Sequence, residues 1–141
     1  MSDVHIQPWQ GDQSELGLAA VMYAQVFSEA PYGEDPEAGR KSFIERTTRY
    51  RDQLPDFRLL LAWDQADIVG LVLGTGITTG NWWYDKVVEM LTPDQREQWM
   101  PAECYSVGEL AVTPRSRGQG LGAQLMRSVV AGLPYRTALL S

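Results

Sequence analysis

The stretch from residue 102 to residue 140 restricts the possible fold more than any other part of the sequence. An apolar segment over 102–112 is followed by Pro114, which cannot continue a strand ladder because it has no backbone N–H. A loop rich in glycine and arginine comes next, then apolar residues at helical spacing over 120–132, and then a short apolar segment at 137–140. This order of strand, helix and strand is a βαβ unit, which favours parallel pairing of the two strands. The sequence therefore predicts a sheet with at least one helix packed on it.

The preceding residues predict that this sheet is mixed. The elements expected there are a strand over 4–9, a helix capped by Ser14, a helix that opens at Asp35 or Pro36 and ends before Pro55, strands over 57–63 and 68–74, and one or two short helices within 81–100. The strands on either side of residues 64–67 are joined by a short polar turn, so they are expected to pair antiparallel. In the second helix, Phe43, Ile44 and Thr47 are expected to face inward and the arginines outward. The predicted fold class is α/β (α+β), a mixed, mostly antiparallel central sheet flanked by helices, in a single domain over residues 1–141.

Composition excludes several classes of protein. The chain is 44% hydrophobic and 21% charged, which is typical of a globular domain, and its net charge of −6 argues against binding to nucleic acid or an anionic membrane. The single cysteine, Cys104, allows neither a disulfide within the chain nor a multi-cysteine metal site, so no metal is expected. No apolar run approaches the length of a membrane span, and the first ten residues lack the apolar core of a signal peptide. We therefore expect a soluble cytoplasmic domain.

Charge is distributed unevenly along the chain. All 18 acidic residues lie within residues 1–109, whereas residues 110–141 contain Arg115, Arg117, Arg127 and Arg136 and no acid. A segment without acids in an acidic protein suggests local attraction for an anion, although chance over a short segment is an alternative at this point.

The segment Arg117-Gly118-Gln119-Gly120-Leu121-Gly122 lies where the expected helix begins. Backbone N–H groups at a helix start are unpaired and carry the positive end of the helix dipole, so they suit phosphate oxygens, and glycines allow close approach. An ordinary glycine-rich turn is one alternative. A dinucleotide fingerprint is another, because Gly118, Gly120 and Ala123 fit G-x-G-x-x-A, but five residues separate the strand from the first glycine and no acid follows Glu109. A P-loop fits poorly because no Lys-Ser or Lys-Thr follows the glycines.

The extended motif carries a family resemblance. Glu109-Leu110-Ala111-Val112-Thr113-Pro114, followed by Arg117-x-x-Gly120-x-Gly122 and Leu125-Met126, resembles the acetyl-CoA signature of the GCN5-related N-acetyltransferases (GNAT superfamily). The order of the expected elements is also similar to that family over most of the chain, although the sharp motif spans only residues 109–126. The resemblance implies a GNAT-like acyl-CoA N-acyltransferase fold. It also implies transfer of an acetyl group from acetyl-CoA, the co-substrate, to a primary amine of a small molecule or peptide.

The resemblance also implies which residues bind the cofactor. The backbone of Leu110, Ala111 and Val112 would bind the thioester and pantetheine amides, as a neighbouring strand would. The pyrophosphate would lie on the backbone amides of Arg117, Gly118, Gln119, Gly120, Leu121 and Gly122. The N–H of Leu110 or Ala111 would stabilise the oxyanion that forms when the amine attacks.

The sequence also offers candidates for the acid–base residues and the acceptor site. Glu109 is a carboxylate within the expected strand, where burial could raise its pKa toward that of a useful base, and Ser106 could hold a water there. Glu109 could equally orient the substrate or form a salt bridge. Tyr32, in the loop after the first helix, and the aromatic run Trp82, Trp83 and Tyr84 are candidates for binding the substrate.

The family normally continues beyond the strand that follows the cofactor helix, so a C-terminally truncated form of the fold is expected here. This leaves two possible functions: an acetyl-CoA-dependent N-acetyltransferase, or an acyl-CoA-binding or interaction module without turnover. The strand expected at 137–140, with apolar Ala138, Leu139 and Leu140, would have an unpaired edge, so a homodimer is a further expectation, with a frayed C-terminus as the alternative.

Overall fold

The computed structural model describes residues 4–29, 32–78, 82–99, 103–135 and 138–140. Its elements are β1 (Val4–Pro8), α1 (Gln13–Ser28), α2 (Pro36–Gln53), β2 (Arg58–Asp64), β3 (Asp67–Thr78), α3 (Trp82–Glu89), α4 (Pro93–Trp99), β4 (Glu103–Val112), the 3₁₀ helix η1 (Pro114–Ser116), α5 (Leu121–Val130) and β5 (Ala138–Leu140). The strands form one sheet in the order β1-β2-β3-β4-β5. Strands β1 to β4 pair antiparallel and β5 pairs with β4 in parallel, which confirms the predicted mixed, mostly antiparallel sheet.

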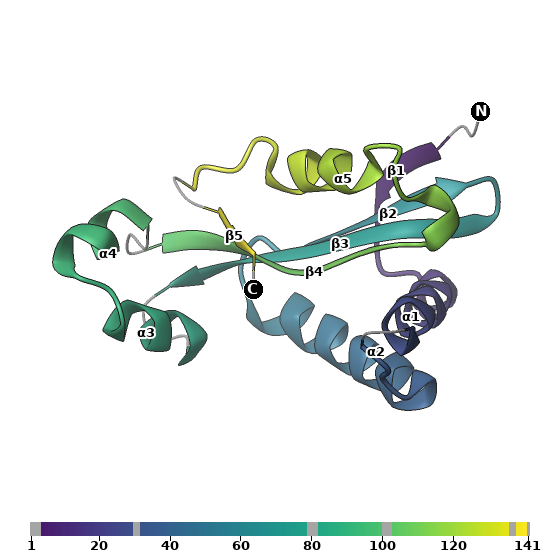
Figure 1. The fold of residues 1–141 in the computed structure, drawn as a ribbon, viewed down its shortest axis with the longest axis horizontal. Helices are drawn as coiled ribbons and strands as arrows, with labels where there is room; N and C mark the ends of the chain where they lie inside the picture. Colours follow the sequence, from purple (N-terminus) through teal and green to yellow (C-terminus); the bar gives the residue numbers. More distant parts are fainter. Residues whose placement is uncertain (1–3, 30–31, 79–81, 100–102, 136–137, 141) are drawn as a thin grey trace.

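Helices cover both faces of the sheet (Figure 1). Helices α1 and α2 pack on one face around a core that includes Leu16, Phe43 and Leu71, each almost fully buried. Helix α5 packs on the other face, where Leu125 and Val129 are fully buried. The short helices α3 and α4 lie at the edge of the sheet where β3 ends and β4 begins (Figure 1). No helix within the described ranges is both long enough and apolar enough to span a bilayer.

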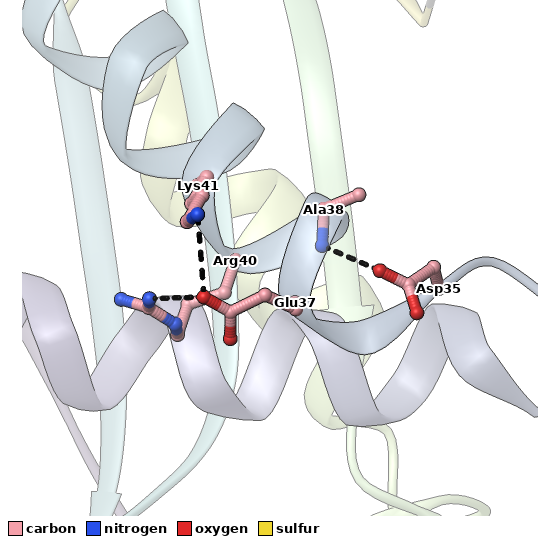
Figure 2. A network of polar contacts seen from close by, with 5 residues as sticks. All are labelled: Asp35, Glu37, Ala38, Arg40 and Lys41. Atoms are coloured by element: carbon pink, nitrogen blue, oxygen red, sulfur yellow. Dashed lines mark hydrogen bonds and ion pairs between the residues drawn. The ribbon is translucent and has the colours of Figure 1, made fainter.

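Helix α2 begins where its sequence predicts. Asp35 has an extended backbone, and its carboxylate accepts a hydrogen bond from the N–H of Ala38 (2.9 Å), while Pro36 occupies the first turn. Glu37 forms ion pairs with Arg40 (2.9 Å) and Lys41 (3.6 Å) one turn later, as Figure 2 shows. These exposed pairs contribute little to stability, whereas the cap determines where the helix starts.

Two details of the expected elements differ from the structure. The cap of α1 is Asp12, whose carboxylate accepts from the N–H of Glu15 (3.0 Å), and Ser14 lies inside the helix. Strand β3 continues to Thr78, beyond the predicted end at residue 74. Its glycines make room for aromatic rings: a Cβ on Gly74 would lie 2.4 Å from the ring of Tyr105. Gly74 and Gly76 therefore serve close packing within the strand.

Candidate functional site

Strand β4 contains an extra residue at Gly108. Val107 and Glu109 lie opposite consecutive residues of β3, so Gly108 between them has no partner and forms a β-bulge. In a regular strand, residues three apart face opposite sides of the sheet. The bulge reverses this alternation, so Ser106 and Glu109 lie on the same face, the one covered by α1 and α2. The two candidate catalytic residues are thus on one side of the sheet only because of Gly108.

Strand β5 pairs with only part of β4. Strand β5 pairs with Tyr105, Ser106 and Val107. Residues 108–112 keep β3 on one side, and among the described residues no strand pairs with their other side. We call residues 108–112 the open edge of β4. Such an edge offers backbone N–H and C=O groups to an extended ligand that carries amides.

The hydrogen-bonding pattern shows which groups face this open edge. The N–H of Thr113 donates to the carbonyl of Val69 in the direction of β3 (2.9 Å). Because alternate residues of an antiparallel strand point to the same neighbour, Ala111 also faces β3, whereas Leu110 and Val112 face the open edge. Of the two amides considered for the oxyanion, the N–H of Leu110 is therefore the one directed outward, and that of Ala111 is used within the sheet.

Residues 117–122 follow η1 and include the first two residues of α5, and we call them the glycine loop. Gly118 and Gly120 have φ angles of +78° and +79°, in the left-handed region that favours glycine. Gly120 is the N-cap of α5 and supplies no side-chain cap to the first N–H groups of that helix. Gly122 lies inside α5 without a positive φ, and a Cβ added to Gly118, Gly120 or Gly122 would meet no atom within 4 Å.

The arrangement of the glycine loop fits a phosphate group. Glycine has a low helix propensity, and at Gly122, the second residue of α5, neither conformation nor packing requires one. The space that a side chain would occupy lies beside unpaired N–H groups at the positive end of a helix dipole. The residues present thus fit the pyrophosphate of a CoA molecule.

The two arginines of this region differ in their surroundings. Arg115 forms an exposed ion pair with Asp67 (3.3 Å). Arg117 donates from Nε to the carbonyl of Val112 (3.0 Å), and among the described residues it forms no ion pair. Its positive charge is therefore held between the open edge and the glycine loop.

A cavity of about 390 Å³ opens beside the open edge. Its walls come from β4, the glycine loop, α1 and the segment after α1, and the residues are Val26, Phe27, Glu29, Tyr32, Leu110, Ala111, Val112 and Arg117. Tyr32 is 62% exposed, and its ring lies 4.9 Å from that of Phe27. The structure thus brings one candidate substrate residue, Tyr32, together with the candidate cofactor residues.

The other candidate substrate residues lie elsewhere in the fold. Trp82, Trp83 and Tyr84 form the first turn of α3, and their side chains are outside the described part of the structure. Helix α3 packs through Val87 and Val88 against the end of the sheet, at Ile77 and Cys104. Their role in substrate binding stays a prediction.

Glu109 is held by side chains from both helices on its face. Arg46 of α2 donates from Nη1 to Glu109 Oε1, and its Nη2 donates to the hydroxyl of Tyr23 on α1 (3.1 Å). Burial raises the pKa of the Glu109 carboxyl, while the charge of Arg46 and a hydrogen bond from Tyr23 oppose this rise. The charge of Glu34 adds to the rise, and the net result is a pKa above the ordinary value.

Arg46 is the functional candidate that sequence reasoning missed. The expectation that the arginines of α2 face outward is wrong for Arg46, whose side chain is 27% exposed. A signal was present, because Arg46 follows the buried Phe43 by three residues and precedes the buried Thr47, so it lies beside the inward stripe. Its partner could not be identified in the same way because it lies in β4, 63 residues along the chain.

Comparisons with known proteins agree with this architecture. Residues 21–133 match the model of the acetyltransferase (GNAT) family. The fold is similar to that of a GCN5-related N-acetyltransferase from Ralstonia eutropha, with 18% identity, a TM-score of 0.65, and coverage of 99% of this chain and 83% of that chain. It is also similar to a GNAT family acetyltransferase from Brucella melitensis in complex with acetyl-CoA, with 17% identity, a TM-score of 0.64, and coverage of 99% and 76%.

A third similar structure is an aminoglycoside N-acetyltransferase in complex with CoA, with 12% identity and a TM-score of 0.65. The match covers 100% of this chain and 78% of that chain. A comparison with curated protein sequences found no significant match. At these identities the solved structures support the fold, while the family model covers most of the sequence itself. The chain therefore belongs to the acetyltransferase (GNAT) family.

Proposed function

We propose that this protein transfers an acetyl group from acetyl-CoA to a primary amine of a small molecule or peptide. The observation that carries the proposal is the position of the open edge of β4 shortly before the glycine loop, with only residues 113–116 between them. An unpaired strand edge suits the amides of a pantetheine arm, and unpaired helix N–H groups suit a pyrophosphate. One extended ligand that carries both groups in this order is an acyl-CoA.

The proposed binding mode uses the backbone more than side chains. Leu110 and Val112 offer the groups that face the open edge, although the carbonyl of Val112 already accepts from Arg117. The N–H groups of residues 117–122 would hold the pyrophosphate, with the charge of Arg117 beside them. Two of the structurally similar proteins were solved with CoA and acetyl-CoA, respectively, which supports the same class of ligand here.

The residues around the open edge also suit the chemistry of acetyl transfer. Acetyl-CoA supplies an acetyl group activated as a thioester: the amine nitrogen would form a bond to the acetyl carbon while the C–S bond breaks, and CoA would leave as a thiolate that takes up a proton. The N–H of Leu110 would donate to the carbonyl oxygen as negative charge develops on it. The attacking amine must lose a proton, and Glu109, on the same face as Ser106, would accept it directly or through a water at Ser106.

Two measurements on the same preparation test this proposal. Isothermal titration calorimetry with acetyl-CoA measures binding, and a free-thiol assay measures CoA release in the presence of an aminoglycoside, a diamine and a peptide with a free α-amine. We expect binding, and thiol release that depends on one class of amine. Binding without thiol release from any amine would instead identify an acyl-CoA-binding module, and absence of binding would contradict the proposed site.

A further inference from the structure

Arg46, Tyr23 and Glu109 form a polar cluster between three elements. Arg46 comes from α2, Tyr23 from α1 and Glu109 from β4. One nitrogen of the guanidinium donates to the Glu109 carboxylate, and the other donates to the Tyr23 hydroxyl (3.1 Å). The Glu109 side chain is only 14% exposed, so its carboxylate depends on these partners more than on solvent. The cluster lies immediately before Leu110, whose N–H faces the open edge.

The position of the cluster is set by aromatic packing. The ring of Tyr23 stacks on Phe43 of α2, with centroids 4.8 Å apart, and lies 4.6 Å from the ring of Phe27. The guanidinium of Arg46 also lies 5.6 Å from the centre of the Tyr23 ring, a cation–π distance. Tyr23 is 5% exposed, so its hydroxyl cannot move far without disturbing the core. Arg46 is thereby held at one orientation as it reaches Glu109.

The surroundings of Glu109 make Arg46 electrostatically important. The charged and titratable groups that act on it are Arg46 from α2, Tyr23 from α1 and Glu34 from the segment before α2. Burial and Glu34 favour the protonated carboxyl, whereas Arg46 and Tyr23 favour the carboxylate. Arg46 is the only cation among these groups. Without it, burial and the charge of Glu34 would raise the pKa of Glu109, and only the hydrogen bond from Tyr23 would oppose that rise. A neutral Glu109 could not accept a proton from an amine.

We infer that Arg46 is a positioning residue for acetyl transfer, and that it acts by holding the Glu109 carboxylate ionised and in one orientation beside the open edge of β4. This inference rests on the proposed function, because it requires that Glu109 accepts the proton of the amine. It assigns a functional role to a side chain of α2 that reaches the open edge through the Glu109 carboxylate. Tyr23 supports Arg46 through its second nitrogen.

The test compares Arg46→Met with the matched variant Arg49→Met. Arg49 lies one turn further along α2 and pairs with the exposed Glu45, so its replacement removes the same charge from the same helix without a contact to Glu109. In Arg46→Met the pKa of Glu109 rises further, so the acid limb of kcat/KM moves to higher pH. An adjacent opposite charge typically changes the ionisation equilibrium of a carboxyl roughly 10-fold or more, so on the acid side of the limb kcat/KM should fall by about that factor, and it should recover as the pH rises.

Three further readouts separate this role from a purely structural one. Arg46→Lys keeps the charge and should keep the wild-type pH profile, whereas Tyr23→Phe should move the acid limb in the same direction by less than Arg46→Met. Arg49→Met should leave the profile unchanged. An Arg46→Met profile that is lower at every pH but not displaced would overturn the inference, because loss of folded protein lowers activity without moving the limb.

The ionisation of Glu109 can also be followed without an acceptor. The carboxyl ¹³C signal that disappears in Glu109→Gln should titrate at higher pH in Arg46→Met than in the wild type and in Arg49→Met. An unchanged titration would overturn the inference whatever the activity. Failure of the wild type to release thiol with every amine would count against the proposed function instead, so the two failures are distinguishable.

Discussion

The three glycines of the glycine loop differ in backbone conformation. Gly118 and Gly120 adopt positive φ angles that side chains disfavour, so their conformation alone accounts for them. Gly122 has helical geometry and open space above it, so neither conformation nor packing accounts for the missing side chain, whereas the proposed pyrophosphate would. Gly122 is therefore the position at which binding and stability can be changed independently.

At Gly122, replacement by aspartate should separate binding from folding. A carboxylate in the first turn of α5 interacts favourably with the helix dipole, by about 0.3–1 kcal/mol, so the melting temperature should stay the same or rise. Like charges about 4 Å apart repel by roughly 1–4 kcal/mol, so calorimetry should show a loss of acetyl-CoA affinity of roughly 10-fold or more.

Gly122→Asn provides the matched control for charge. It adds nearly the same volume without a negative charge, so its affinity for acetyl-CoA should fall less than that of Gly122→Asp. Equal losses in the two variants would mean that volume rather than charge limits binding. Unchanged affinity in a folded Gly122→Asp protein would mean that the phosphate does not bind at residues 117–122.

The C-terminal end of α5, opposite the glycine loop, is hydrogen-bonded to strand β2. Arg58, at the start of β2, donates from Nη1 to the carbonyls of Val129 (3.0 Å) and Ala131 (2.8 Å). These are the carbonyls that a helix leaves unpaired at its C-terminus, where a cation also suits the dipole. The first turn of α5 is left free of side-chain caps, while its last turn is held by the sheet.

Replacing Arg58 by methionine should therefore affect stability and spare binding. Hydrogen bonds to charged groups contribute about 1.5–3 kcal/mol, and partial exposure reduces this, so urea unfolding should show a loss of about 1–2 kcal/mol. Arg49→Met, which removes an exposed pair between residues four apart, should cost only about 0.3–0.5 kcal/mol. Acetyl-CoA affinity should be the same in both variants, and a large loss in Arg58→Met would show that the whole helix moves when its C-terminus is freed.

In the whole molecule, the proposed ligand would contact several parts of the fold at once. The open edge belongs to β4, the glycine loop leads into α5, and the adjoining cavity is walled partly by α1. Helix α1 lies on one face of the sheet and α5 on the other (Figure 1). A ligand held there should stabilise the fold as a unit rather than a single loop.

Acetyl-CoA should accordingly raise the melting temperature of the whole domain. At a concentration 100 times its Kd, a ligand that binds only the folded state adds about 2.7 kcal/mol. For a chain of this size 1 kcal/mol corresponds to about 3–4 °C, so a single unfolding transition should rise by roughly 10 °C in differential scanning calorimetry. The Gly122→Asp variant should show much less of this rise, and an equal rise in that variant would place the ligand elsewhere.

The sequence by itself determined most of the elements and identified the candidate cofactor segment. Helical periodicity, the Asp35 cap, the turn at residues 64–67 and the glycine loop act over a few neighbouring residues, so they can be recognised locally. The same local signals identified β4 and α5 as consecutive parts of a βαβ unit, and the structure confirms the parallel pairing of β4 with β5.

Only the tertiary structure decided how the catalytic candidates are arranged. The bulge at Gly108 changes which residues share a face, and it becomes apparent only from the register of β4 against β3. The partner of Glu109 was likewise hidden, because Arg46 reaches it from a helix 63 residues away, through the packing of α2 on the sheet. Local sequence patterns report the conformation of neighbouring residues, whereas an ion pair in a core depends on how separate elements are packed together.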